Sequence, residues 1–219
     1  DAPLAAFTVS NSATTSATTR HRPRIVILGG GFGGAYCAQE LGRRLHRSQA
    51  DVLLVDRQNY FVFYPLLVEA GTGSLEPRHA VVSLRTFLRA ASFRMAEVTG
   101  IDPAAKRVDY RLSSTGDPGS VEYDHLVLAL GSVTRFPDVP GLRELGFGVK
   151  SMADAVALRD HAIEMLELAD STDDQAVRDG ALHFVVVGGN FTGAEVAGEF
   201  STFLRNATHY YPNLREKDV

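Results

Sequence analysis

The sequence predicts an α/β protein: a parallel sheet of the Rossmann type with an antiparallel insertion, plus the start of a second Rossmann domain. Three observations predict this fold. A short apolar run at Ile25–Leu28 enters a glycine-rich turn, and a helical pattern and a second apolar run follow, which is the order of a βαβ unit. Runs typical of antiparallel strands fill residues 92–124. The pattern of strand, glycine turn and helix then recurs from residue 182.

Composition excludes several classes of protein. The 219 residues are 45% hydrophobic and 22% charged, which is ordinary for a globular protein. A net charge of −4 gives no basic footprint for nucleic acid. The single cysteine, Cys37, excludes an internal disulfide, and we expect it to be a small core residue. The histidines show no metal-ligand spacing, so we expect no metal. The apolar stretch Ile25–Ala38 is interrupted by glycines and too short to span a bilayer.

The N-terminal elements follow from periodicity. Residues 1–21 are rich in Ala, Ser and Thr and are expected to be a disordered tail. The first strand at Ile25–Leu28 precedes a helix expected over residues 33–46, and Asp51–Asp56 is the second strand. Glu76-Pro77 is typical of a helix start, so we expect a helix that continues through Leu88.

The next region is predicted to be mostly extended. We expect antiparallel strands at residues 93–101, 106–112 and 121–123. Leu126–Leu130 is a continuous apolar run and predicts another buried strand, which Gly131 ends.

Two helices and one strand are expected in the C-terminal part. Residues 151–168 predict an amphipathic helix that Ser151 and Asp154 begin as a capping box. Residues 170–180 are expected to be a polar linker, and Leu182–Val187 a buried strand that leads through a glycine turn into a helix.

The first glycine turn carries the clearest chemical signal. Gly29, Gly31 and Gly34 fit the pattern G-x-G-x-x-G. The first glycine makes a tight turn, the second lets a pyrophosphate approach the backbone, and the third lets helix and strand pack closely. The pyrophosphate would lie at the helix N-terminus. Asp56 ends the next strand and would accept the ribose hydroxyls, which favours FAD or NAD over NADP because an acid repels a 2′-phosphate.

A second, degenerate copy of the turn follows the strand expected at residues 182–187. Gly188 and Gly193 hold the first and third glycine positions, and Asn190 occupies the middle one. Two such turns in one chain describe two nucleotide-binding folds, as a flavin and a nicotinamide cofactor would need together.

Five segments resemble a known family. They are RIVILGGGFGGAYCAQEL, VLLVDRQNYFVFYPLL, the Ala-Glu-Val of residues 96–98, YDHLVLALGS and VVVGGNFTGAEVAGEF. In order and spacing they resemble type II NADH dehydrogenase, the single-subunit FAD-containing NADH:quinone oxidoreductase of the two-dinucleotide-binding-domain flavoprotein superfamily. The resemblance runs from Arg24 to Asn206, and Phe61–Leu67 is its most family-specific piece.

This resemblance implies FAD and NADH as cofactors. Four glycines of the turn, Gly29, Gly31, Gly33 and Gly34, would hold the FAD pyrophosphate. Val98 would contact adenine through its backbone, and residues 65–67 would lie beside the isoalloxazine. Residues 129–131 match a turn near FAD in which Leu130 replaces the family's Thr. Glu195, expected in the first turn of the second helix, is the candidate catalytic residue. The implied FAD contacts are Gly29, Gly31, Phe32, Gly33, Gly34, Asp56, Arg57, Pro65, Leu66, Leu67, Val98, Ala129, Leu130 and Gly131, and the implied NADH contacts are Gly188, Asn190, Thr192, Gly193 and Glu195.

The resemblance also divides the chain. It implies a FAD-binding domain at residues 22–145 and an incomplete NADH-binding domain at 146–219. The family's later NADH strand, its Gly-Asp return to the FAD fold and its membrane-binding C-terminal region do not occur before Val219. We expect them in the same polypeptide or in a partner chain. Through them the protein would lie on the cytoplasmic face of the membrane, whereas this chain alone would be soluble. A homodimer is left open.

The function predicted is hydride transfer from NADH to FAD followed by electron transfer to a quinone, as in a respiratory chain. Two alternatives stay open. One is a truncated, non-catalytic dinucleotide-binding module. The other is a flavin-dependent ferredoxin or rubredoxin reductase. A disulfide reductase is disfavoured because no cysteine pair follows the first glycine turn.

Overall fold

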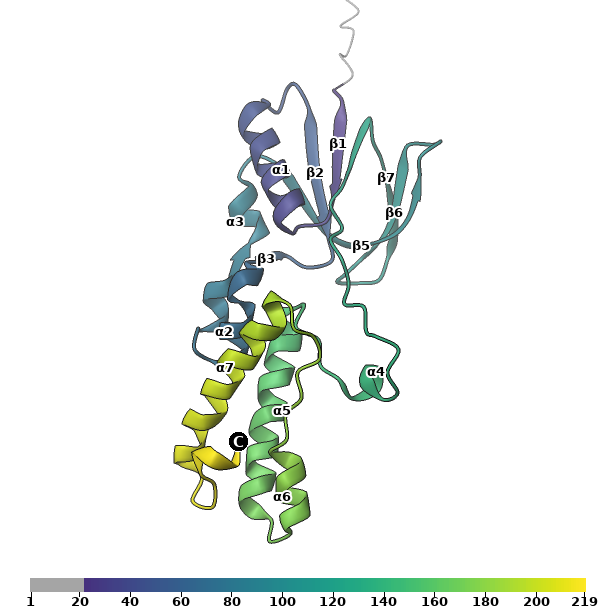
Figure 1. Cartoon of the computed structure of the whole chain (residues 1–219). Coiled ribbons are helices and arrows are strands. Elements are labelled where there is room, and N and C mark those ends of the chain that lie inside the picture. Colours follow the sequence, from purple (N-terminus) through teal and green to yellow (C-terminus); the bar gives the residue numbers. More distant parts are fainter. Residues whose placement is uncertain (1–21) are drawn as a thin grey trace, which may run out of the picture.

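A computed structural model describes residues 22–219 (Figure 1). The tail predicted for residues 1–21 lies outside the described residues. One six-stranded sheet has the order β7-β6-β5-β2-β1-β8, which confirms the α/β prediction. Its strands are β1 (Arg24–Leu28), β2 (Asp51–Asp56), β5 (Ser92–Asp102), β6 (Arg107–Leu112), β7 (Pro118–Glu122) and β8 (His125–Leu128).

The sheet is parallel on one side and antiparallel on the other, because the long strand β5 belongs to both parts. Its first four residues, from Ser92 to Met95, pair in parallel with β2. From Ala96 onward it pairs antiparallel with β6, which in turn pairs with β7. The antiparallel strands therefore turn over one face of the parallel sheet (Figure 1), where Val26 and Val55 pack against Val108.

Helices cover the opposite face. The N-terminal helices are α1 (Phe32–Arg44), α2 (Leu67–Thr72) and α3 (Leu84–Leu88), and a two-stranded ribbon consists of β3 (Tyr60–Val62) and β4 (Val81–Ser83). Ala35 and Ala38 of α1 and Leu84 of α3 pack with Ile27 and Leu54 of the sheet, and all five are buried. Small residues on α1 let the helix lie close to the strands, which positions its N-terminus at the carboxyl ends of β1 and β2.

The C-terminal part is helical. It contains α4 (Leu142–Leu145), α5 (Met152–Ser171), α6 (Gln175–Ala181) and α7 (Phe191–Ala207). The predicted capping box of α5 is confirmed: the Asp154 N–H donates to Ser151 Oγ at 3.1 Å, and the Ser151 N–H donates to the Asp154 carboxylate at 2.8 Å. Leu166 of α5 packs with Phe200 and Leu204 of α7. Helix α2 lies against both α5 and α7 (Figure 1), and its Leu67 packs with Val62 of β3, so α2 joins this part to the β3–β4 ribbon.

The helix predicted from Glu76 through Leu88 is wrong in its middle. Residues Pro77–Ala80 form a 3-10 turn and Val81–Ser83 form β4, so only Leu84–Leu88 are α-helical. Val82 lies opposite Phe61 of β3 in an antiparallel pair. Adjacent β-branched residues favour an extended backbone once a partner strand is available. The helix α2 was not predicted.

Two predictions for the C-terminal part are also wrong. The segment expected to be a polar linker contains α6, which Asp174 caps by accepting the Ala176 N–H at 2.9 Å. Leu182–Val187 forms no strand in the described chain, and Val185 is 71% exposed. A strand needs a neighbour to pair with its backbone. Among residues 22–219 no strand lies beside this run.

The strand predicted at Leu126–Leu130 is β8, but it is not buried. It pairs with β1 and occupies the edge of the sheet, and Leu128 is 62% exposed. An apolar run alone cannot distinguish a covered strand from an edge strand whose faces are open.

Candidate functional site

The first glycine turn has the backbone geometry that its spacing predicts. Gly29 has a backbone φ of +102°, which residues other than glycine rarely adopt. A Cβ on Gly34 would lie 1.8 Å from the Gly29 carbonyl oxygen, whereas a Cβ on Gly31 would meet nothing within 4 Å. Helix α1 therefore packs closely against the turn while space remains beside Gly31.

The N-terminus of α1 is open toward that space. Its N-cap is Gly31, which has no side chain to accept a hydrogen bond from the first turn. The first N–H groups of a helix have no partner within the helix, and together with the helix dipole they favour an anion. The residues present therefore fit a dinucleotide pyrophosphate.

Asp56 lies at the carboxyl end of β2, next to the turn. One carboxylate oxygen accepts the Gly30 N–H, and the other accepts the Gln58 N–H at 2.7 Å. These contacts fix the carboxylate beside the glycine turn, where ribose hydroxyls could donate to it. Gly30 was not among the predicted site residues, although the run of three consecutive glycines could have indicated it. The neighbouring Arg57 is exposed.

The segment after β8 completes the turn's surroundings. A Cβ on Gly29 would lie 2.2 Å from the Ala129 carbonyl oxygen. The Ala129 N–H donates to the Leu28 carbonyl at 2.8 Å, and Gly131 has φ +72°. The structure therefore brings Ala129 against Gly29, while Leu130 is 61% exposed. Residues a hundred positions apart thus meet at one end of the parallel strands.

The predicted ring contacts lie in two different environments. Pro65 is exposed and Leu66 is half-buried in a 3-10 turn, but Leu67 is buried against Val62 and Ala155. The Leu67 side chain is thus part of the core, and only its backbone can face a ligand.

Phe32 directly follows the first glycine turn as the first residue of α1, whereas Val98 lies on β5, where it pairs with Tyr110 of β6. The Phe32 side chain is 40% exposed. Its ring meets the rings of Phe61 and Phe63 in edge-to-face geometry, with ring centroids 4.9 Å and 5.6 Å apart. Val98 follows the Met95–Asp56 pair along β5, at a bulge.

The second glycine turn repeats the first in its backbone. Gly188 has φ +114°, and a Cβ on Gly193 would lie 2.0 Å from the Gly188 carbonyl oxygen. The difference is at the N-cap. Asn190 has an extended backbone, and its side chain accepts the Gly193 N–H at 3.0 Å. Asn190 therefore occupies a donor that Gly31 leaves free in the first turn.

Glu195 lies in the second turn of α7, not in the first as predicted, because the helix begins at Phe191. It is exposed, as is Thr192. Four residues later, Glu199 accepts a hydrogen bond from Ser74 at 3.3 Å. That contact links α7 to the segment that follows α2.

The described residues contain neither a candidate metal site nor a membrane-spanning helix. Within residues 22–219, no group of three or more His, Cys, Asp or Glu side chains could hold a metal ion. In the same part of the chain, no helix is both long and apolar enough to cross a bilayer.

The model of a family described as pyridine nucleotide-disulphide oxidoreductase matches residues 23–215. The chain belongs to this family. Its two glycine turns and the sheet that positions the first of them lie inside the match.

Two curated relatives are 34% and 35% identical to this chain, and a solved structure with a similar fold is 27% identical to it. An external alternative NAD(P)H-ubiquinone oxidoreductase B2 of Arabidopsis thaliana is 34% identical over 94% of this chain. A demethylphylloquinone reductase of a Synechocystis strain is 35% identical over 83% of it. The solved structure of NDH2 from Plasmodium falciparum in complex with NADH has a TM-score of 0.80 at 27% identity over 90% of this chain. The chain spans only 36%, 43% and 40% of these three proteins.

Proposed function

We propose that this chain is the N-terminal, nucleotide-binding portion of an FAD-dependent NADH:quinone oxidoreductase. The observation that carries the proposal is the repeated turn geometry. In both turns the first glycine has a left-handed backbone, and the third faces its carbonyl oxygen at a distance that excludes a side chain. Membership of the family and the similarity to NAD(P)H-quinone oxidoreductases support it.

Three of the predicted residues, Gly31, Asp56 and Asn190, then have a physical task. The first turn of α1 donates N–H groups to the FAD pyrophosphate, and Gly31 leaves space for it. Asp56, already held by two N–H groups, accepts the ribose hydroxyls. The second turn takes the NADH pyrophosphate, with Asn190 competing for one donor. Bound FAD would supply the redox chemistry, since it can take a hydride from NADH and pass electrons to a quinone.

The proposed quinone acceptor also indicates where in the cell the reaction would occur. A quinone with an apolar tail partitions into lipid, so we propose that the natural protein works at a membrane surface. Sequence outside residues 1–219 would supply the attachment. We propose NADH rather than NADPH as donor on the basis of the family resemblance.

The test is to purify the natural protein that carries these 219 residues and to assay it with FAD, NADH and a water-soluble quinone analogue. We expect a yellow protein that reduces the quinone at the expense of NADH. Gly31→Ala should abolish both properties. A higher kcat/KM for NADPH would refute the proposed donor.

Two other outcomes would overturn the proposal. FAD binding without NADH oxidation would identify a non-catalytic module. Efficient reduction of ferredoxin or rubredoxin, with no quinone reduction, would identify a reductase of those carriers.

A further inference from the structure

A groove lies between α1 and α3, on the outer side of the helices that cover the sheet. Its volume is about 610 Å³, within the range of small-molecule sites. Val82, which is 45% exposed, and Phe87 give it an apolar lining. Gly42 lets the helices approach, because a Cβ there would lie only 3.2 Å from the Cβ of Ala90. The groove is therefore a concave apolar surface formed by packing of the two helices.

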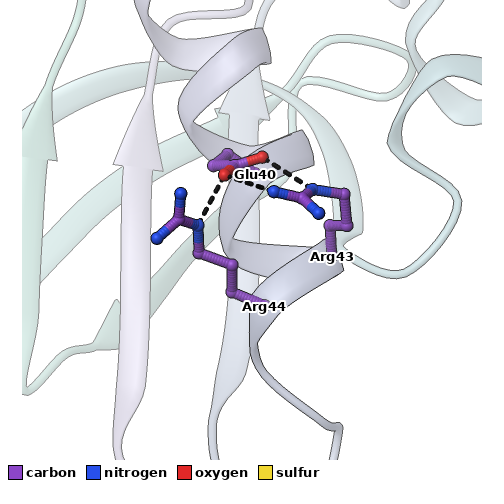
Figure 2. Close-up of polar contacts among 3 residues, drawn as sticks. All are labelled: Glu40, Arg43 and Arg44. Atoms are coloured by element: carbon purple, nitrogen blue, oxygen red, sulfur yellow. Dashed lines mark hydrogen bonds and ion pairs between the residues drawn. The ribbon is translucent and has the colours of Figure 1, made fainter.

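Two arginines, Arg43 and Arg89, line the groove together with these apolar residues. Glu40 accepts hydrogen bonds from both Arg43 and Arg44, as Figure 2 shows. One carboxylate thus serves two guanidinium groups, and this cluster keeps a net positive charge. No hydrogen bond or ion pair joins the Arg89 guanidinium to another described residue. Arginine favours carboxylate and phosphate groups because its planar donors match their oxygens.

The backbone of Arg89 is strained. Its φ of +45° is unusual for a residue other than glycine, and the Ala90 N–H donates to the Leu88 carbonyl across it. Such a γ-turn with positive φ is rare. Glycine would adopt it without strain. Residues with backbone strain of this kind cluster at functional sites.

The two segments that line the groove are rich in the same charge. Residues 32–47 and 76–90 contain only two acids, Glu40 and Glu76, against six arginines. By contrast, residues 150–219 contain twelve acids and six basic residues. The six arginines of residues 32–47 and 76–90 are Arg43, Arg44, Arg47, Arg78, Arg85 and Arg89. In a protein of net charge −4, the two segments that line the groove therefore carry a local excess of positive charge, which favours anions.

We propose that the groove binds a free long-chain carboxylate, with its acyl chain on Val82 and Phe87 and its head group at Arg43 and Arg89. The apolar lining beside two arginines matches a molecule that is apolar along its length and anionic at one end. A single-chain acid fits a groove of this size, whereas a membrane surface would need a flat contact. This site is separate from both glycine turns.

The probe is cis-parinarate, a fluorescent long-chain carboxylate, titrated below its micelle concentration into the 219-residue chain. We expect saturable binding, and we expect its uncharged methyl ester to bind at least about tenfold more weakly. Arg89→Gly should weaken binding about tenfold or more without lowering Tm, because the strain is relieved while the guanidinium is lost. Arg47→Ala removes an equal charge outside the groove and should change Kd by no more than about twofold.

A second variant tests the apolar half of the site. Val82→Asp places a carboxylate on the lining at an exposed position and should abolish binding. Equal affinities of the wild type and Arg89→Gly would overturn the proposal, as would tighter binding of the ester. The proposal would also be overturned if the protein sediments with phosphatidylglycerol vesicles but does not bind monomeric parinarate. That result would identify the groove as part of a membrane-binding surface.

Discussion

Asp56 shows how a single carboxylate can be prepared for a ligand before the ligand arrives. Two backbone N–H groups, from Gly30 and Gln58, already donate to it. A side chain held in this way loses little conformational freedom on binding, which favours affinity. The same contacts mean that removing the whole side chain would leave two donors unpaired. A test of its role therefore needs a replacement that retains an oxygen acceptor.

Asp56→Asn is expected to weaken FAD binding by about tenfold or more, because the amide keeps only one oxygen acceptor, is neutral, and turns an NH2 donor toward either the Gly30 or the Gln58 N–H. Asp51→Asn, at the other end of the same strand, is the matched control. It removes an equal charge and a partly exposed ion pair with Arg24, and FAD binding should not change. FAD content measured by absorbance after heat release decides the result. Equal FAD content in the two variants would contradict the proposed role.

Glu195→Gln is expected to lower turnover at least about tenfold while FAD content stays constant, because the exposed carboxylate lies near the proposed NADH turn. Glu199→Gln, one helical turn later, alters the contact with Ser74 instead. Steady-state kcat with both substrates saturating separates the two. A wild-type kcat in Glu195→Gln would assign that residue a structural role only.

At the scale of elements, the contact between α1 and the first turn depends on the absence of one side chain. Gly34→Ala should destabilise the fold by about 1–3 kcal/mol, because its methyl group would overlap the Gly29 carbonyl. Gly31→Ala should leave Tm unchanged and abolish FAD binding, because the methyl group would fill only the ligand's space. Thermal unfolding and FAD titration of both variants give the readout. Equal loss of Tm in the two would mean that the space beside Gly31 has no such role.

The C-terminal half of α1 makes a prediction about pH. Hydrogen bonds from Arg43 and then from Arg44 lower the pKa of the Glu40 carboxyl from 4.5 to about 2. A lowered pKa in the folded state means that these contacts stabilise the protein above pH 4.5 and are lost as the pH falls through about 2. An NMR titration should therefore give a Glu40 pKa near 2. In the Arg43→Ala/Arg44→Ala double variant the pKa should return toward 4.5, and a native pKa already at 4.5 would refute the assignment.

The sequence predicted local elements better than their burial. The glycine turns, β2 and the start of α5 depend on residues close together in the chain, so the pattern was sufficient. Whether Leu126–Leu130 and Leu182–Val187 are buried or paired depends on distant segments that no local pattern reports. Val81–Ser83 became a strand for the same reason, because β3 lies beside it. At the site, the competition of Asn190 for a backbone donor became visible only from its side-chain geometry.

At the scale of the whole molecule, the two glycine turns differ in how well their surroundings are formed. The first lies at the end of four parallel strands, whereas the run before the second is unpaired and Val187 is 58% exposed. Because the run before the second turn is unpaired, the 219-residue chain alone is expected to show negligible NADH:quinone activity. Because the chain spans only 36% and 43% of the two curated relatives, it is also expected to bind FAD weakly. Bound FAD per chain and NADH oxidation are the measurements. A stoichiometrically yellow, active monomer would contradict this expectation.

The pairing of β1 with β8 has a consequence for synthesis. Ile25 pairs with His125, so one edge of the first strand has no partner until about a hundred further residues have been made. At about 5–20 residues per second, that interval is on the order of 5–20 s. For this time a strand of five residues, three of them fully buried in the finished sheet, carries an open edge on the ribosome. Early assembly must therefore depend on β2 and α1, and a chaperone that binds short apolar segments would encounter β1 before β8 does.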